Sequence, residues 1–446
     1  MKLDFFYDVF SEHSTKSAII YQELNTNYDV LSKLILQWKT KFPEWNILKG
    51  DVVAIVGDFT PNTIAILFAL IENNNIIVPF DFLQRDKIEK KMQIAGVSKV
   101  IMVDETNNVH FSNYQGNLDH IFYSNLREKS KPGLVLFTSG TSGEPKAAVH
   151  DLTMLLEKFK LKKRTYRTLN FLLFDHWGGL NTMFHTLSNG GVVLALNDRK
   201  PTAICFFIEK HKIELLPASP TFLNLLLISE EYKNYDLSSL KLITYGTEPM
   251  PQSTLRRVKE IFPDIKMQQT YGLIELGVLR SKSKSDDSLW VMIGGEGYQT
   301  RVVDGLLEIK AESAMLGYLN APSPFTEDGW FMTGDQVEVD GEYFKILGRK
   351  SEIINVGGEK VYPAEVENVI LEMDGVAEVT VYGEKNPIIG NIVCAKVRLL
   401  NDVDKKEFIF KLKAFCKIRL QSFMVPVKVI IDKTEQYSQR FKKIRN

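Results

Sequence analysis

Hydroxyl-bearing residues and glycines alternate directly after an apolar segment in the first third of the chain. Residues 134–137 have the composition of a short buried strand. This strand is followed by a run of six small residues: Thr138, Ser139, Gly140, Thr141, Ser142 and Gly143. Glycine lets the backbone approach an anion closely and direct several N–H groups at one oxygen atom. The hydroxyls would donate further hydrogen bonds and Lys146 would add a positive charge, so the pattern predicts a phosphate-binding loop.

A Walker-type loop is the nearest alternative for this segment, but that loop requires a serine or threonine directly after its lysine. Pro145 precedes Lys146 and Ala147 follows it, so no hydroxyl is placed to hold magnesium in that way. An ordinary surface turn also fits the segment taken alone. The complete string Thr-Ser-Gly-Thr-Ser-Gly-Glu-Pro-Lys, however, closely resembles the signature loop of adenylate-forming enzymes. This superfamily comprises acyl-CoA synthetases, adenylation domains of peptide synthetases and beetle luciferases.

Two further segments resemble motifs that contact adenine and magnesium in this superfamily. The first matches a turn that lies along the adenine, and it contains Gly246, Thr247 and Glu248. The second, residues 269–275, matches a Tyr-Gly-x-Thr-Glu motif and includes Thr270 and Gly272. The resemblance implies that the flat ring of Tyr271 packs on adenine. It also implies that Glu275 holds the Mg²⁺ that bridges the phosphates of ATP.

One residue of the second motif departs from the superfamily. Ile274 stands where the superfamily has a threonine whose hydroxyl contacts the α-phosphate, and losing that donor would slow adenylation. A catalytically impaired protein that binds nucleotide is therefore one alternative. A later Trp-Phe-x-Thr-Gly-Asp motif implies that Asp335 accepts hydrogen bonds from both ribose hydroxyls. Arg349 matches the arginine that also contacts the ribose.

The carboxylic acid is expected to bind beyond the carboxyl ends of parallel strands. Strands are predicted over residues 52–56, 76–79, 170–174, 191–195, 213–217 and 242–245. His176 resembles the histidine of a His-x-x-Gly segment that borders the carboxylate in acyl-CoA synthetases, and a histidine that only caps a backbone group is the alternative. Phe174 and Asp175 reproduce a pair that binds the substrate ammonium in amino-acid-activating domains, so an amino-acid adenylating carrier-protein ligase is a second hypothesis. The candidate substrate residues are Phe174, Asp175, His176, Gly246 and Leu273.

The end of the chain resembles the small domain of the superfamily. Ser351 occupies the pivot of a hinge-like segment, and Gly357 and Gly358 resemble the loop along which a pantetheine arm passes. The final residues resemble a tail that brings a lysine to the active site. Two alignments are open, one selecting Lys442 and the other Lys443, and we prefer Lys442. The glycine that normally precedes this lysine is absent.

The composition excludes several other classes of protein. Lys plus Arg equals Asp plus Glu at 55 each, so charge gives no reason to expect nucleic acid or an anionic membrane as partner. The three cysteines are far apart in the chain of 446 residues, which fits a reducing cytoplasmic compartment better than a disulfide framework. No secretory pattern is visible and no apolar run approaches membrane-spanning length, so membrane insertion is not expected.

Together these features predict an α/β protein with two domains. Residues 1–348 would form a large N-terminal domain of βαβ-layered sheets with a small β-barrel-like part, β-rich at 294–310. Residues 349–446 would form a small mobile α+β domain with helices over 364–373 and 405–420 and strands over 379–382, 392–397 and 427–431. Residues 1–49 look helical.

The resemblance implies an acid–thiol ligase that uses ATP and Mg²⁺. The enzyme would convert a carboxylic acid into an acyl-adenylate with release of pyrophosphate. It would then transfer the acyl group to a thiol, either that of CoA or that of the phosphopantetheine on a carrier protein. The residues that would take part in catalysis are Lys442 or Lys443, Glu275 and His176.

Overall fold

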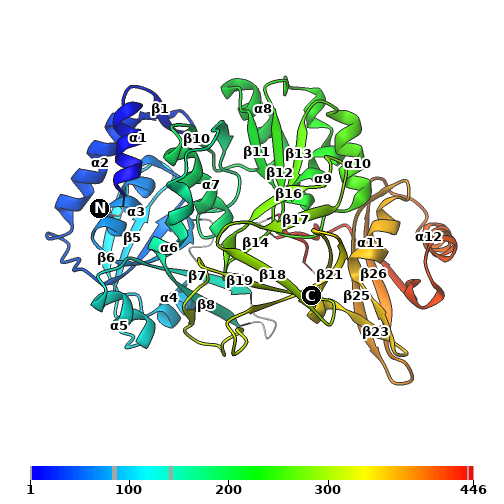
Figure 1. Ribbon diagram of the computed structural model, residues 1–446. Helices are drawn as coiled ribbons and strands as arrows, with labels where there is room; N and C mark the ends of the chain where they lie inside the picture. Colours follow the sequence, from blue (N-terminus) through cyan, green and yellow to red (C-terminus); the bar gives the residue numbers. More distant parts are fainter. Residues whose placement is uncertain (1–2, 83–87, 140–143, 439–440, 445–446) are drawn as a thin grey trace.

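The computed structural model of the protein describes residues 3–82, 88–139, 144–438 and 441–444. Its main sheets are two of seven strands, an antiparallel one of six strands and a smaller C-terminal one (Figure 1). The C-terminal segment lies to one side of the larger body in Figure 1. The arrangement is the mixed α/β fold that the sequence predicts.

The first sheet contains the hairpin of the phosphate loop and the predicted βαβ unit. Its strands in spatial order are β20 (Gly317–Tyr318), β8 (Pro145–Asp151), β7 (Gly133–Ser139), β4 (Ile76–Asp81), β3 (Val52–Gly57), β5 (Lys99–Val103) and β6 (Val109–Asn113). Helix α3 (Pro61–Glu72) joins β3 to its parallel neighbour β4. The helix begins where the Thr60 hydroxyl accepts a hydrogen bond from the Thr63 amide at 3.2 Å. Its mostly apolar residues are nearly all buried, as expected for a helix enclosed by the core.

The second sheet provides the strand ends at which a substrate was expected. Its order is β13 (Lys266–Gln269), β12 (Leu242–Tyr245), β11 (Leu215–Ala218), β9 (Arg167–Leu169), β10 (Val192–Ala195), β1 (Ser17–Tyr21) and β2 (Leu24–Asn27). All neighbours except β1 and β2 pair in parallel. The connecting helices are α7 (Trp177–Ser188), α8 (Pro201–His211), α9 (Pro220–Ser229) and α10 (Gln252–Ile261). The strands predicted at 191–195, 213–217 and 242–245 are therefore confirmed.

Two predictions for this sheet are wrong. Residues 1–49 contain α1 (Asp4–Glu12) and α2 (Tyr28–Lys41), but the hairpin of β1 and β2 lies between them. Strand β1 forms because it pairs with the distant β10, and a partner so far along the chain leaves no local pattern. The strand predicted at 170–174 is β9, which ends at Leu169. Phe171 and Phe174 are buried in the connection to α7, so the apolar run at 170–174 indicates burial and not pairing in a strand.

The third sheet holds two of the predicted ribose contacts. Its order is β16 (Arg280–Ser283), β17 (Trp290–Gly294), β22 (Tyr343–Arg349), β21 (Phe331–Asp340), β19 (Leu306–Ala311) and β18 (Tyr298–Val303). The hydrogen-bonded strands form an open antiparallel path at the place where the sequence led us to expect a barrel-like part. A separate short hairpin consists of β14 (Gly272–Leu273) and β15 (Gly277–Val278). Asp335 lies within β21 and opposite Arg349 of β22.

The C-terminal segment forms an α+β unit with its own core. The sheet contains β24 (Glu359–Val361), β23 (Ile354–Val356), β26 (Gly390–Leu399), β25 (Val376–Asn386) and β27 (Lys428–Ile431). Helices α11 (Pro363–Leu371) and α12 (Lys405–Arg419) pack on it, and the buried cluster includes Val366, Ile370 and Leu412. A short 3₁₀ turn, η4 (Lys350–Glu352), separates this unit from β22. The helices and strands predicted for this segment are confirmed.

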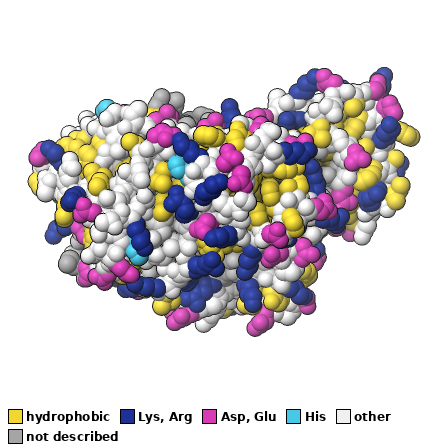
Figure 2. Space-filling model, turned by 90° about the horizontal axis from the view of Figure 1, so that it is seen from above, with side chains coloured by type: hydrophobic (Ala, Val, Ile, Leu, Met, Phe, Trp, Pro, Cys, Tyr) yellow, Lys and Arg dark blue, Asp and Glu magenta, His cyan; other side chains and the backbone are white. Residues whose placement is uncertain are grey.

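The remaining helices are α4 (Glu89–Ala95), α5 (Ile121–Glu128) and α6 (Leu152–Leu156). Short 3₁₀ turns are η2 (Glu157–Phe159), η3 (Glu231–Lys233) and η5 (Ser422–Met424). The three cysteines are buried and free. Within the described part of the chain, no helix combines the length and apolar composition needed to cross a bilayer. Figure 2 shows acidic and basic side chains interspersed over the face in view.

Candidate active site

The predicted phosphate loop lies in sequence between two antiparallel strands of the first sheet, β7 and β8. Strands β7 and β8 pair up to Thr138 opposite Lys146 and Ser139 opposite Pro145. The predicted loop residues Gly140, Thr141, Ser142 and Gly143 lie outside the described residues. The hairpin nevertheless fixes where the loop starts and ends, because its last residue pairs are hydrogen-bonded strand positions.

Lys146 and Glu275 approach the same tyrosine beside this hairpin. The Lys146 ammonium lies 5.5 Å from the centre of the Tyr318 ring. Tyr318 belongs to β20, which pairs with β8, the strand of Lys146. The Tyr318 hydroxyl donates a hydrogen bond of 2.6 Å to Glu275 Oε1. Burial, followed by the nearby Glu275 carboxylate, raises the pKa of Tyr318 well above its usual value. The phosphate hairpin and the predicted metal ligand are therefore parts of one cluster.

Glu275 is a buried carboxylate and thus fits a hard cation such as Mg²⁺. Among the described residues, no group of three or more histidine, cysteine or acidic side chains could form a metal site by itself. A Mg²⁺ site with few protein ligands is typical where substrate phosphates and water complete the coordination. The structure thus fits a metal that arrives with a nucleotide.

Tyr271, Asp335 and Arg349 form a second polar cluster. The Tyr271 hydroxyl donates to Asp335 Oδ2 at 2.5 Å, and Arg349 Nε lies 2.7 Å from Asp335 Oδ1. Burial raises the pKa of Asp335, while the Arg349 guanidinium and the Tyr271 hydroxyl act in the opposite direction. Burial and the Asp335 charge raise the pKa of Tyr271. A carboxylate has about four lone-pair positions, so Asp335 retains acceptor capacity for hydroxyl groups of a ligand.

The turn after β12 brings the predicted adenine residues next to the C-terminal tail. A Cβ atom on Gly246 would lie 2.6 Å from the Thr270 carbonyl oxygen, so only glycine fits this close approach. Thr247 has a left-handed backbone with φ of 74°. Glu248 accepts a hydrogen bond from Thr221 N at 2.8 Å and another from Lys443 N at 3.1 Å. Glu248 therefore links the turn to α9 and to the tail.

His176 caps α7 and also borders a cavity. Its Nδ1 accepts a hydrogen bond from Gly178 N at 3.0 Å, so the ring acts as the N-cap that was the alternative reading of this residue. A neutral imidazole that accepts at Nδ1 carries its proton on Nε2 and can donate only from there. The two roles are compatible because they use different nitrogen atoms.

A cavity lies beside His176. Its lining combines four apolar side chains with four polar ones from distant segments: Phe171, Leu172, Leu173, His176, Arg199, Thr247, Phe441 and Lys442. The structure thus brings His176, Thr247 and Lys442 together, as the sequence motifs predict. Phe174 and Asp175 directly precede His176 in the sequence and both are buried. They are not among the described residues that line the cavity.

Arg199 is a cavity residue that the sequence analysis missed. Its guanidinium bonds both carboxylate oxygens of Asp58 at 2.8 and 2.9 Å, and its Nε donates to the Phe171 carbonyl at 2.9 Å. Both side chains of the pair are more than nine-tenths buried. Asp58 follows β3 and Arg199 follows β10, so charged residues after predicted strands were the signal available in the sequence.

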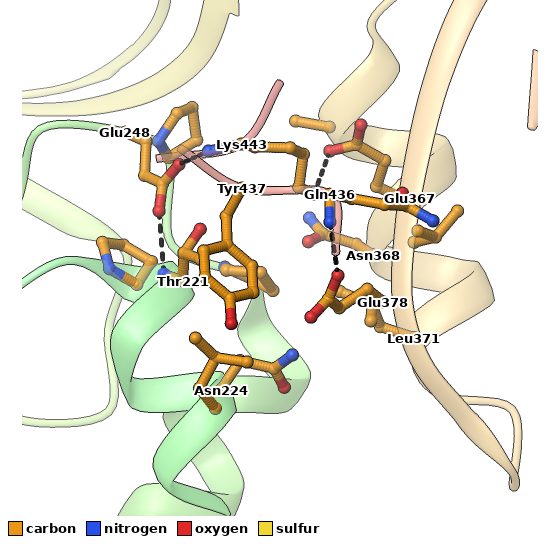
Figure 3. Close-up of a pocket in the computed structure, with 16 residues that line it drawn as sticks. Thr221, Asn224, Glu248, Glu367, Asn368, Leu371, Glu378, Gln436, Tyr437 and Lys443 are labelled. Carbon is orange, nitrogen blue, oxygen red and sulfur yellow. Dashed lines mark hydrogen bonds and ion pairs between the residues drawn. The ribbon is translucent and has the colours of Figure 1, made fainter. Parts of the chain in front are cut away.

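The two candidate lysines of the tail have different surroundings. Lys442 lines the cavity with His176, whereas the Lys443 ammonium binds Glu367 Oε2 of α11 at 2.7 Å. Figure 3 shows Lys443 between Glu248 and Glu367, at a second cavity that is lined by residues of α9 and α11. The structure therefore brings Lys442, and not Lys443, to the cavity with His176.

Gly357 and Gly358 form the two-residue turn between β23 and β24. Their φ angles of 59° and 94° belong to the left-handed region, which a tight hairpin turn requires. The Gly357 amide donates to Ile389 O at 2.8 Å within the small domain. The structure therefore shows a β-hairpin at this position, and a path for a pantetheine arm remains a prediction.

Comparisons with known proteins identify both parts of the chain. Residues 8–308 match the family described as AMP-binding enzyme, and residues 365–436 match the AMP-binding enzyme C-terminal domain. An indoleacetate–CoA ligase of Aromatoleum aromaticum is 26% identical over 86% of this chain and 85% of its own length. A long-chain-fatty-acid–CoA ligase of Bacillus subtilis is 25% identical over 92% of this chain and 75% of its own length.

A solved structure of the anthranilate–CoA ligase AuaEII in complex with anthranoyl-AMP superimposes with a TM-score of 0.83 at 18% identity. The match covers 100% of this chain and 95% of that one, so the fold extends over both domains. The family match covers the segments that carry the phosphate hairpin, Tyr271 and Glu275. The chain therefore belongs to the family of AMP-binding enzymes, the adenylate-forming superfamily that its motifs resemble.

Proposed function

We propose that the protein activates a carboxylic acid with ATP, forms an acyl-adenylate with release of pyrophosphate, and transfers the acyl group to the thiol of CoA. The observation that carries this proposal is the position of Lys442. It lies in one cavity with His176 and Thr247, although the tail and these residues are far apart in sequence. CoA ligases among the relatives and the acyl-AMP bound to AuaEII support the same chemistry.

In the first step the residues around the cavity position two anions and reduce their repulsion. The Lys442 ammonium would lie between the acid carboxylate and the α-phosphate. The Nε2–H of neutral His176 would donate to the carboxylate, because its Nδ1 is already used by Gly178 N. Lys146 and the backbone of the phosphate hairpin would bind the remaining phosphate oxygens. Mg²⁺, when bound through Glu275, would supply further positive charge to the phosphates.

The ribose would be bound by the cluster of Asp335, Tyr271 and Arg349. Asp335 is held in place by a strand on each side and by two hydrogen-bond donors, so its carboxylate does not reorganise when a ligand arrives. The partly exposed Arg349 lies on the solvent side, with 47% of its side-chain surface accessible. This arrangement supports the ribose contacts that the motifs imply for both residues.

The second step requires the tail to leave the cavity. We propose that residues 1–348 and 349–446 act as two domains that rotate about Ser351. The separate buried core of residues 354–431 and the short turn η4 support a boundary at this place. Rotation would withdraw Lys442 and bring the hairpin of Gly357 and Gly358 towards the acyl-adenylate for attack by the thiol.

The acid that best fits the cavity lining is apolar or aromatic. Phe171, Leu172 and Leu173 provide apolar walls beside His176. Arg199 is neutralised by two hydrogen bonds to Asp58, so it does not call for a second carboxylate on the substrate. Indoleacetate and anthranilate, named for two related ligases, belong to this class of acid.

The two alternative functions receive less support. An amino-acid ligase would need Asp175 in the cavity, but Asp175 is not among the described residues that line it. A catalytically impaired protein was suggested by Ile274, and this side chain packs against the buried clusters on both sides of it. Ile274 therefore has a structural reason to be apolar, whereas the cluster of Lys442, His176 and Thr247 is retained.

A pyrophosphate-exchange screen across aryl, fatty and amino acids, with and without CoA, tests the proposal. We expect exchange with aromatic or apolar acids and formation of an acyl-CoA when CoA is added. Lys442→Ala should lower exchange by about 10² to 10³, the usual effect of removing a group that stabilises transition-state charge. ATP binding without pyrophosphate exchange for any acid would contradict the proposal. Acyl transfer only to a carrier protein would show that the acceptor is its phosphopantetheine thiol and not CoA.

A further inference from the structure

We propose that Phe441 is a positioning residue that anchors the C-terminal tail to the large domain and thereby holds Lys442 in the cavity during acid activation. The inference rests on the proposed function for its catalytic consequence. Phe441 directly precedes Lys442, at the position where the tail of the superfamily has a glycine. The anchor is therefore a feature of this chain and not of the shared motif.

The ring of Phe441 packs into an aromatic socket formed by Phe171 and Phe222. Its centre lies 5.4 Å from that of Phe171 and 5.6 Å from that of Phe222, the latter in an edge-to-face arrangement. The two socket rings contact each other at 4.4 Å and are 2% and 0% exposed. Tyr437 also stacks on Phe441, with 5.7 Å between the ring centres. Aromatic pairs of this geometry stabilise an interface beyond the area that they bury.

Two polar contacts of the tail backbone flank Lys442. The Phe441 carbonyl accepts a hydrogen bond of 2.6 Å from Ser219 Oγ, and the Lys443 amide donates to Glu248 Oε2 at 3.1 Å. Ser219 is the N-cap of α9, where its Oγ also accepts from Phe222 N. The residues before and after Lys442 are thus both bound to the large domain, which restricts the position of Lys442 itself.

The side chain of Lys443 binds within the small domain instead. Its ammonium pairs with Glu367 of α11, which is 3% exposed at its side chain (Figure 3). This pair can persist when the small domain rotates, so the tail would move together with that domain. Among the described contacts of the tail, withdrawal of Lys442 then requires the loss of those to the socket, Ser219 and Glu248. The strength of the Phe441 contact would set how readily the tail leaves.

The backbone of Phe441 makes glycine a suitable test substitution. Its φ is 48°, in the left-handed region that glycine adopts without the steric cost of a Cβ atom. Phe441→Gly therefore removes the ring while it leaves the observed backbone conformation accessible. Phe441→Leu keeps an apolar side chain and serves as the conservative variant. Phe410→Ala is the matched control, since this phenylalanine is 75% exposed on α12.

The two half-reactions should respond differently to these variants. We expect Phe441→Gly to lower pyrophosphate exchange about tenfold, the loss that corresponds to two aromatic pairs of ordinary strength. The KM for ATP should stay unchanged, and acyl transfer from preformed acyl-adenylate to CoA should be as fast as in the unchanged protein or faster. Phe441→Leu should recover most of the exchange, and Phe410→Ala should alter neither step. Equal loss in both half-reactions, or no loss in exchange, would overturn the proposal.

Hydrogen exchange of the tail tests the anchor without any substrate. The peptide that contains the Lys443 amide should be protected in the unchanged protein and should exchange about tenfold faster in Phe441→Gly. Unchanged protection in that variant would overturn the proposal whatever the enzyme activity. If the unchanged protein shows no exchange of pyrophosphate with any acid, the proposed function fails, and the tail experiment still decides whether Phe441 anchors the tail.

Discussion

Replacing Asp335 by alanine should weaken ATP binding about 100-fold. The carboxylate is 6% exposed and held by Tyr271 and Arg349, so it is positioned before a ligand arrives. Hydrogen bonds to a charged acceptor contribute about 1.5–3 kcal/mol each, and the two ribose hydroxyls would lose about 3 kcal/mol together. That free energy corresponds to roughly a 100-fold change in Kd. Calorimetric titration of ATP into the unchanged protein and into Asp335→Ala measures the two Kd values.

A nucleotide analogue separates the loss of ribose contacts from general damage to the fold. The unchanged protein should bind 2′-deoxy-ATP about tenfold more weakly than ATP, because one hydroxyl is missing. In Asp335→Ala this preference should nearly vanish, since the acceptor is gone. Tyr271→Phe removes one donor to Asp335 but keeps the carboxylate, so it should weaken ATP binding less than Asp335→Ala and keep a preference for ATP over the analogue. Equal affinity of Asp335→Ala and the unchanged protein for ATP, or the same preference for ATP over the analogue in both, would refute the proposed ribose site.

Two further predictions concern stability. Arg199→Met should lower the free energy of unfolding by about 3–5 kcal/mol because it leaves buried Asp58 without its cation, and urea denaturation should show partial recovery when Asp58→Asn is added. Burial lowers the pKa of His150 to about 4, so the folded state binds the proton less tightly than the unfolded state, whose pKa is about 6.5. The contribution of His150 to the free energy of unfolding should therefore be fully present above pH 6.5. It should fall by about 1.4 kcal/mol per pH unit between pH 6.5 and about 4. Denaturation curves recorded across that range should show a smaller decline for His150→Phe.

The sequence predicted those helices and strands that are marked by residues within the same segment, such as capping residues or a run of apolar side chains. The helix after β3 carries such a signal, because Thr60 and Pro61 are typical of a helix start, and the structure shows both in those roles. The strands β10, β11 and β12 were visible as apolar runs. Strand β1 was missed because its stability comes from pairing with β10, far along the chain. The run at 170–174 was misassigned because apolar residues bury equally well in an irregular connection.

The motifs predicted which residues belong to the site better than they predicted how those residues contact one another. Asp335 and Tyr271 were assigned separately to ribose and adenine, and nothing in the sequence indicated their mutual hydrogen bond. The pair of Asp58 and Arg199 was missed because the two residues belong to different sheets and follow no shared motif. Contacts of this kind depend on how the sheets are placed relative to each other, which no short segment encodes.

The tail shows why spacing alone could not choose between the two lysines. Lys442 and Lys443 are neighbours of the same type, and the glycine that would fix the alignment is absent. Their surroundings separate them, because Phe441 enters the socket of the large domain and Glu367 of the small domain binds the ammonium of Lys443. A phenylalanine in place of glycine therefore does more than obscure the motif: its ring fixes the register of the tail, and that register places Lys442 in the cavity that His176 also lines.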